Sequence, residues 1–266
     1  MNTSPKIPPL KNNPDELLIY GRRAVEAVWK RRPQAIIRAY ATSERLSWLG
    51  EMLRWCATQR KAYHMVSPAD LEKITHSVHH EGVALLIKAK PKVSELDLLS
   101  SLEKKPGALV LLDGVNNPHN IGAIMRTMAH FGNPALIGAL GELPEISPAW
   151  ARISEGATEM VALHRARSHL GIMAALKQQG YVSFALSSQA SETIYDCSLP
   201  AKSLFLFGNE ISGLSAPVLK QADRSLVIPG SGQLPSLNVS AAAALCLGEW
   251  YRQQAHTLAA ASLRRK

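Results

Sequence analysis

Three separated segments in the second half of the chain place polar side chains and glycines where short apolar runs end. They span residues 116–126 (NNPHNIGAIMR), 207–214 (FGNEISGL) and 227–240 (VIPGSGQLPSLNVS). Each continues into a helix-like pattern, and loops that lead from a strand into a helix are where α/β folds bind ligands. The amide, carboxylate and guanidinium groups of these segments can hold a ligand by hydrogen bonds. The pattern therefore predicts one site, assembled from loops at a sheet edge.

The phosphate-binding motifs of the common nucleotide folds are absent from the sequence. Neither GxGxxG nor GxxxxGK[ST] occurs. Gly230-Ser231-Gly232 is only a partial echo, because Pro235 stands where a third glycine would be. An ordinary dinucleotide or nucleoside-triphosphate site therefore has little support.

The elements that must position these loops follow an α/β pattern. Short apolar runs predict strands at residues 108–112, 135–137, 181–186, 203–207 and 225–228. Helical patterns separate them, among them residues 122–131, 168–179 and 238–253. Strands that alternate with helices favour a parallel sheet covered on both faces, so the predicted fold class is α/β.

The N-terminal third predicts a smaller α/β unit. Helices are expected at 22–31 and 46–59 and from Pro68, with Ser67 as the N-cap, and strands at 35–41, 62–66 and 82–89. The expected organisation is a disordered proline-rich tail at 1–14, a domain at 15–90, a linker or bridging helix at 91–106, a domain at 107–257 and a tail at 258–266.

Positive charge is concentrated in the same N-terminal third. The formal net charge of the chain is +9, and residues 1–90 hold 15 basic and 8 acidic side chains, a net of +7. Such a charge indicates a polyanionic partner such as RNA. The candidate RNA contacts are Arg22, Arg23, Arg31 and Arg32, with a solvated helix face as the alternative. A membrane is not expected, since no long apolar run or basic amphipathic helix is present.

The cysteine and histidine content predicts neither disulfides nor a metal site. Cys56, Cys197 and Cys246 are odd in number and far apart, which argues against a disulfide framework and a cysteine-based zinc site. The adjacent His79 and His80 have no evident third ligand, so we expect a turn there and no metal. The sequence start has no apolar core of signal-peptide type, and a reducing, cytoplasmic location fits these features.

The three segments resemble, in order, the three motifs of the SpoU or TrmH-like family of RNA ribose 2′-O-methyltransferases in the SPOUT class. The matching stretches are NPHNIGAIMRTMAHFG from Asn117, LFLFGNEISGL from Leu204 and IPGSGQLPSLNVSAAAALCLGEW from Ile228. The N-terminal unit, with YGRRAVEAVWK and HHEGVALLI, is similar to the ribosomal-protein-like RNA-binding domain that often precedes this catalytic domain. The resemblance implies a parallel-sheet SPOUT domain with a C-terminal trefoil knot, a homodimer, and S-adenosylmethionine as cofactor.

The resemblance also implies roles for individual residues. The catalytic residues it implies are Asn120, Arg126, Glu210, Ser236 and Asn238. The cofactor-binding positions it implies are Gly208, Ile228 and Leu237, which act through backbone groups. Taken singly, each residue has a more ordinary interpretation, such as a helix cap or a solvated charge. Their ordered joint occurrence favours the functional interpretation.

A ribose hydroxyl is a poor nucleophile, so the enzyme must align it with the activated methyl group and ease proton loss. Arg126 is expected to clamp the RNA phosphate and stabilise the developing alkoxide, with Glu210 orienting the guanidinium. The predicted function is methyl transfer to a ribose 2′-hydroxyl of tRNA or rRNA. The alternatives are a non-catalytic RNA-binding or ribosome-assembly protein and, less favoured, a base methyltransferase. We expect residues 91–266 to fold and bind the cofactor without the N-terminal unit.

Overall fold

The computed structural model describes residues 13–263, with side-chain detail as far as residue 255. Residues 1–12, most of the predicted N-terminal tail, lie outside the described part. The chain forms two compact units. Unit 1 comprises the described residues up to Pro91 together with Ile146–Glu159, and unit 2 comprises Lys92–Glu145 and the residues from Met160 onward. The chain therefore passes between the two units three times.

Unit 1 is a mixed four-stranded sheet with helices on both faces. Its strand order is β1-β4-β2-β3, with β1 at Glu16–Tyr20, β2 at Ile36–Ala41, β3 at Ala62–Met65 and β4 at Val83–Lys88. Helices α1 (Arg22–Arg31) and α2 (Leu46–Thr58) share one core cluster on the sheet, and α3 (Pro68–Thr75) packs through Leu71 against Tyr40 in another. As predicted, Ser67 caps α3 by accepting a hydrogen bond from the backbone N–H of Asp70.

The sequence analysis missed strand β1, which follows directly on the proline-rich start. It pairs antiparallel with β4, from Glu16 opposite Lys88 to Tyr20 opposite Ala84. As an edge strand with one partner, β1 gives only a short apolar signal of its own.

Residues 146–159 belong to unit 1, although they lie between two strands of unit 2. Helix α6 (Pro148–Ile153) buries Trp150 completely, and Ala151 joins the core cluster that includes Val25. Gly156 has a φ of +86°, and a Cβ there would lie 2.4 Å from the Cβ of Ala27. This packing argues against the expectation that residues 91–266 fold alone, because removing the N-terminal residues would take away the core against which α6 packs.

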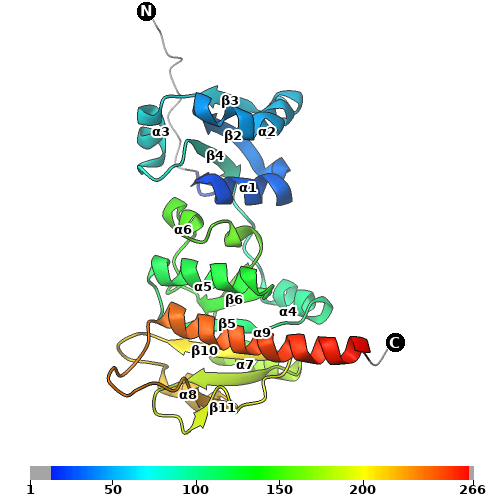
Figure 1. Cartoon of the computed structure of the whole chain (residues 1–266), viewed down its shortest axis with the longest axis vertical. Coiled ribbons are helices and arrows are strands. Elements are labelled where there is room, and N and C mark those ends of the chain that lie inside the picture. The colour runs from blue at the N-terminus through cyan, green and yellow to red at the C-terminus, as the bar shows by residue number, and fades with distance from the viewer. Residues whose placement is uncertain (1–12, 264–266) are drawn as a thin grey trace, which may run out of the picture. The chain divides into compact units, whose positions relative to one another are not determined.

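Unit 2 contains a seven-stranded sheet in the order β7-β6-β5-β10-β8-β11-β9. Figure 1 labels its strands β5, β6, β10 and β11. Its strands are β5 at Leu109–Asp113, β6 at Ala135–Ala139, β7 at Ala162–Ala166, β8 at Val182–Leu186, β9 at Glu192–Thr193, β10 at Ser203–Gly208 and β11 at Arg224–Val227. Every pair of neighbouring strands runs parallel, which confirms the predicted parallel sheet. Strands β7 and β9 were not expected.

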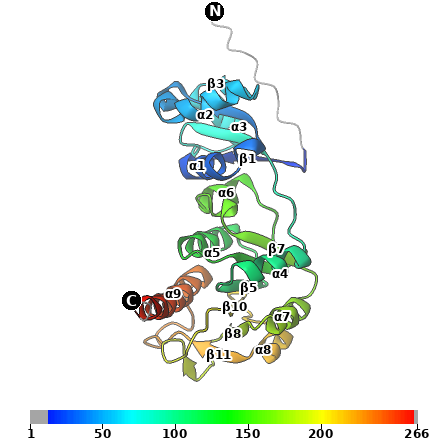
Figure 2. The same cartoon turned by 90° about the vertical axis from the view of Figure 1, so that its right-hand side faces the viewer.

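Helices cover both faces of this sheet, as Figure 2 shows. On one face lie α4 (Glu95–Lys104), α7 (His169–Gln178) and α8 (Ala216–Gln221), which share a core cluster with the strands. On the other, α5 (Pro118–His130) packs against α9 (Val239–Leu263). The expected linker at 91–106 is thus mostly α4, whose Leu98 and Leu102 are fully buried in unit 2. Helix α9 runs past the predicted domain end at 257.

Within residues 13–263, no helix combines the length and the apolar character needed to cross a lipid bilayer.

Candidate functional site

The first segment begins helix α5 four residues earlier than the sequence pattern indicated. Asn117 caps the helix by accepting a hydrogen bond of 2.9 Å from the backbone N–H of His119, and Pro118 takes the first helical position. Asn120 therefore lies in the first turn. Arg126 follows six residues later and is exposed. Since a helix rises about 1.5 Å and turns about 100° per residue, Arg126 lies about 9 Å further along the helix axis than Asn120 and about 120° around it.

The second segment is a tight loop organised by Asn209. The Asn209 side chain accepts a hydrogen bond of 2.9 Å from the Ile211 backbone and donates one of 3.0 Å to the Gly114 carbonyl. The backbones of Asn209 and Gly213 exchange two further hydrogen bonds of 3.1 and 2.8 Å. The sequence analysis missed this residue, although asparagine commonly organises turns by bonding to the backbone two residues on.

Gly208 has a reason to be glycine within the chain itself. A Cβ at this position would lie 2.1 Å from the carbonyl carbon of Gly213 and 2.2 Å from the nitrogen of Leu214. The sequence analysis gave this glycine a role in binding the cofactor through its backbone. The loop that follows already requires it, and a cofactor contact at its backbone stays a prediction.

The third segment ends in the cap of helix α9. Asn238 Oδ1 accepts hydrogen bonds from the backbone N–H of Ser240 at 2.9 Å and from the Ser240 hydroxyl at 2.6 Å. This satisfies one of the free N–H groups at the start of the helix. The cap also fixes which end of the Asn238 amide faces outward.

One residue from each segment meets in a continuous line of hydrogen bonds. Asn238 Nδ2 donates to Asn120 Oδ1 at 3.1 Å, and Asn120 Nδ2 donates to Glu210 Oε1. The order of donors is fixed by chemistry, because an ionised carboxylate can only accept and the Ser240 backbone N–H can only donate. Both amides are thereby held in one orientation. The three segments do form one cluster at the carboxyl end of the sheet.

The remaining predicted residues lie on the surface of unit 2. Ser236 is exposed, the Leu237 side chain is half exposed, and Ile228 is partly buried just after β11. Glu210, expected to orient Arg126, accepts the hydrogen bond from Asn120. The structure thus brings together Asn120, Glu210 and Asn238 of the five predicted catalytic residues.

The loop at 228–237 offers its backbone to a ligand. Among the described residues, the one hydrogen bond that forms within it runs from Gln233 N to Ser231 Oγ at 3.4 Å. A Cβ added to Gly230 or Gly232 would meet nothing within 4 Å, so the loop borders open space. Exposed backbone donors and acceptors beside the apolar Leu234 fit a cofactor whose adenine and ribose are held by main-chain groups.

The four arginines predicted to contact RNA have different surroundings within unit 1. Arg22 lies 3.5 Å from Glu26 and stacks over Trp48, and Arg23 lies 3.4 Å from Glu155; both are exposed, as is Arg31. Arg32 differs, because its Nε lies 2.8 Å from a carboxylate oxygen of Glu159, whose side chain is only 5% exposed. The structure gives Arg32 a structural task, which is to hold segment 146–159 in place.

Arg32→Ala should lower the free energy of unfolding by about 3 kcal/mol, because loss of one partner leaves a buried charge poorly compensated. Lys90 also lies 3.4 Å from Glu159. Burial lowers the pKa of the Lys90 ammonium group, although the nearby Glu159 carboxylate acts in the opposite direction. Arg31→Ala, one residue earlier and exposed, is the control and should change stability little. Equilibrium urea unfolding measures both. Equal stability of the two variants would refute the structural role.

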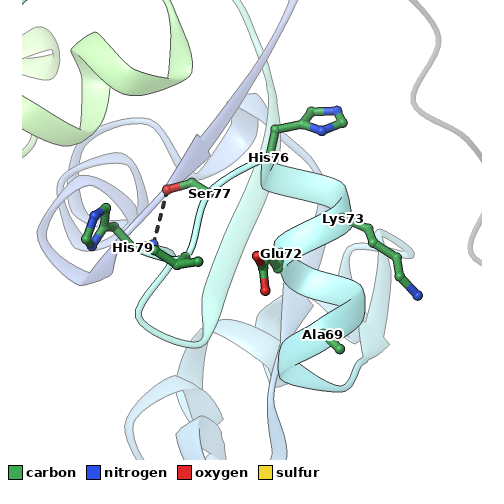
Figure 3. Close-up of a pocket in the computed structure, with 7 residues that line it drawn as sticks. Ala69, Glu72, Lys73, His76, Ser77 and His79 are labelled. Carbon is green, nitrogen blue, oxygen red and sulfur yellow. Dashed lines mark hydrogen bonds between the residues drawn. The ribbon is translucent and has the colours of Figure 1, made fainter.

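A broad surface hollow of about 800 Å³ lies in unit 1 at helix α3 and the turn that follows (Figure 3). It is lined by Ala69, Glu72, Lys73, His76, Ser77, Val78 and His79. None of the predicted site residues lines it, and the His76 and His79 rings point to opposite sides. In the described part of the chain, no three His, Cys, Asp or Glu side chains are grouped as metal ligands would be.

Comparison with known proteins agrees with the sequence resemblance. Residues 107–248 match the model of the SpoU rRNA methylase family, and residues 18–93 match that of the RNA 2′-O ribose methyltransferase substrate-binding domain. A protein of Escherichia coli O157:H7 named as the uncharacterized tRNA/rRNA methyltransferase YfiF is 35% identical over 239 residues, which are 90% of this chain and 69% of that protein. The 23S rRNA (guanosine-2′-O-)-methyltransferase RlmB of Vibrio parahaemolyticus is 30% identical over 241 residues, 89% of this chain and 96% of that protein.

The fold agrees with a solved structure as well. The SpoU methyltransferase AviRb from Streptomyces viridochromogenes, crystallised with AdoMet, superposes with a TM-score of 0.76 and 24% identity over 91% of this chain and 92% of that chain. The chain belongs to the SpoU rRNA methylase family. It is an RNA methyltransferase of the type that modifies ribose 2′-hydroxyl groups.

Proposed function

We propose that the junction of Asn120, Glu210 and Asn238 is the catalytic centre at which the protein methylates a ribose 2′-hydroxyl of tRNA or rRNA. The observation that supports this most is the line of hydrogen bonds that joins one residue from each of the three motifs. If each residue only capped its own helix or organised its own turn, the three side chains would have no reason to bond to one another. The methyl donor of the family is S-adenosylmethionine, and the open backbone of loop 228–237 fits it.

The chain's own residues align the hydroxyl and stabilise charge. Bound S-adenosylmethionine supplies an activated methyl group on its sulfonium. Asn120 and Asn238, already locked in orientation by their neighbours, position the ribose with little reorganisation. The Arg126 guanidinium clamps the RNA phosphate and stabilises the alkoxide that develops as the hydroxyl proton leaves to phosphate or water. Ile228, Leu237 and Gly208 hold the cofactor through their backbones, and Ser236 contacts the ribose.

Three further features are proposed from the family resemblance. The C-terminal part of unit 2 forms a trefoil knot, and the return of α9 to pack on α5 and β10 is compatible with it. The protein works as a homodimer in the cytoplasm, and the exposed Leu245 and Tyr251 of α9 offer apolar surface to a second copy. Unit 1 is a ribosomal-protein-like domain that docks RNA. Sedimentation at several concentrations tests the dimer.

The reaction is tested with tritiated S-adenosylmethionine and total RNA from a strain that lacks the gene. Label should enter dinucleotides that resist alkali, since a 2′-O-methyl group blocks the hydroxyl that cleaves the chain. Asn120→Ala should reduce labelling by about a hundredfold, the usual loss when a preorganised polar group is removed from an active site. Asn116→Ala, exposed in the same segment, is the control.

Other outcomes of this experiment contradict the proposal in distinct ways. Label in alkali-sensitive nucleotides would indicate a base methyltransferase. RNA binding without any transfer would favour the non-catalytic alternative. Mapping the 2′-O-methyl groups that are missing from the deletion strain identifies the substrate as tRNA or rRNA.

Neutralising Arg22, Arg23 and Arg31 together should weaken binding of all RNAs about equally. The logarithm of the RNA-binding constant falls linearly with the logarithm of the salt concentration. For each RNA phosphate that the variant no longer binds, the slope of this line should become shallower by about 0.7 to 0.9, because fewer counterions are released. Arg32 is left intact, because its loss is expected to destabilise unit 1 as well as to remove a charge. A matched variant that neutralises the exposed Lys104, Lys105 and Lys220 of unit 2 removes the same charge. Equal salt slopes for both variants would contradict RNA docking on unit 1.

A further inference from the structure

A carboxylate and an imidazole that are both largely shielded from solvent lie together at the carboxyl end of the sheet in unit 2, and the proposed reaction uses neither. Asp113 is the last residue of β5, and His169 is the first of α7. Their Oδ1 and Nδ1 atoms are 3.3 Å apart, and the two side chains are 13% and 10% exposed. The sequence analysis singled out neither residue.

Asp113 and its neighbour hold both ends of the loop that carries Glu210. The second carboxylate oxygen of Asp113 accepts a hydrogen bond of 2.7 Å from the backbone N–H of Ser215. The carbonyl of Gly114 accepts one of 3.0 Å from the Asn209 side chain. Residues 209 and 215 are thus fastened to the end of one strand. Glu210, between them, reaches Asn120 from a loop whose ends cannot move independently of β5.

The polar contact that the structure gives the His169 imidazole is the one with Asp113. Among the described residues, Nε2 of His169 is buried and has no hydrogen-bond partner. Burying an unpaired nitrogen carries a desolvation cost that an apolar side chain of similar size would not. On the other side of the ring, Nδ1 faces the Asp113 carboxylate. Shielding a carboxylate from water is costly unless donors face it, so this contact offsets the cost of the unpaired Nε2.

We propose that Asp113 and His169 are positioning residues of the methyltransferase. His169 fixes the Asp113 carboxylate, Asp113 fixes residue 215, and the anchored loop holds Glu210 against Asn120. The last step rests on the proposed catalytic role of Glu210. The first two steps concern the loop alone and hold whatever Glu210 does.

Hydrogen exchange in the ligand-free protein tests the anchoring without any substrate. His169→Leu should speed exchange of the amides of residues 213–215 by about tenfold or more, as expected when a local anchor of a loop is lost. His169→Asn keeps an N–H donor at the place of Nδ1 and should restore slow exchange. His164→Leu is the matched control: His164 is 4% exposed, its Nδ1 lies 2.9 Å from the Val93 carbonyl, and its Nε2 is also buried without a partner among the described residues.

Unchanged exchange at residues 213–215 in His169→Leu would overturn the proposal, as would equal acceleration in His164→Leu. Thermal unfolding of all three variants separates loop loosening from global loss of stability.

Label transfer from tritiated S-adenosylmethionine to total RNA of the gene-deleted strain tests the route through Glu210. His169→Leu should slow transfer by about tenfold to a hundredfold, because displacements of about 1 Å in a site have effects of that size. In a Glu210→Ala background the same substitution should add little, since both act through one group. If the two substitutions instead slow transfer independently, so that the loss of rate in the double variant is the product of the two single losses, the route through Glu210 is overturned. Normal turnover by Glu210→Ala alone would instead overturn the proposed role of Glu210, and the exchange result would still decide the anchoring.

Discussion

Arg126→Ala should abolish methyl transfer while the protein still folds and binds S-adenosylmethionine. Arg126 is exposed on α5, so its truncation leaves the core intact. A guanidinium that stabilises developing charge contributes about 100-fold to 1000-fold or more to the rate. Arg126→Lys should rescue poorly, because a point charge does not reproduce the planar fork that binds a phosphate through two N–H groups. Single-turnover labelling measures the rate, and calorimetry measures cofactor affinity.

The control for this variant is Lys104→Ala, which removes one exposed positive charge from α4 in the same unit. Near-normal turnover by Arg126→Ala would remove the residue from the catalytic centre. A loss of cofactor binding equal to the loss of rate would mean that Arg126 acts on the cofactor loop and not on the RNA.

Gly208→Ala should reduce both stability and activity. The new Cβ would come within 2.1 Å of the Gly213 backbone, so residues 209–214 must move and Glu210 must leave Asn120. Backbone displacement of this kind destabilises a protein by about 2 to 4 kcal/mol, and the rate should fall at least about a hundredfold. Gly230→Ala is the matched control for stability, since its Cβ would enter open space.

The two explanations of Gly208 predict different results in this experiment. If the glycine only makes room for the cofactor, Gly208→Ala should unfold at the same urea concentration as the native protein and bind S-adenosylmethionine more weakly. If the loop itself requires the glycine, stability falls even without cofactor. Native stability in Gly208→Ala would therefore contradict the close packing of Gly208 against Gly213.

Local signals made the parallel sheet and the three loop segments predictable. Apolar runs such as residues 203–207 and caps such as Ser67 depend on neighbours within a few residues, and the structure confirms both. Three of the misses involve distant partners. Strand β1 needed β4, helix α6 needed the core of unit 1, and Arg32 appeared to be a surface charge because Glu159 lies 127 residues away.

The candidate site was likewise predictable only in part. Resemblance identified Asn120, Glu210 and Asn238, and the sequence could place them at one sheet edge. It could not show that they bond to one another, nor that Gly208 serves its own loop. Asp113 and His169 escaped notice because a carboxylate at a strand end and a histidine at a helix start have no local pattern that marks them as partners.

The three passages of the chain between the units bear on how the protein is made. The core of unit 1 includes Ala151, so a nascent chain that ends at residue 91 cannot complete it. A further 68 residues, up to Glu159, must be synthesised first, and at about 5 to 20 residues per second this takes about 3 to 14 seconds. During that interval the strands of unit 1 expose apolar surface to the cell. The segment that closes them is delivered only after the first two strands of unit 2, β5 and β6, have been made.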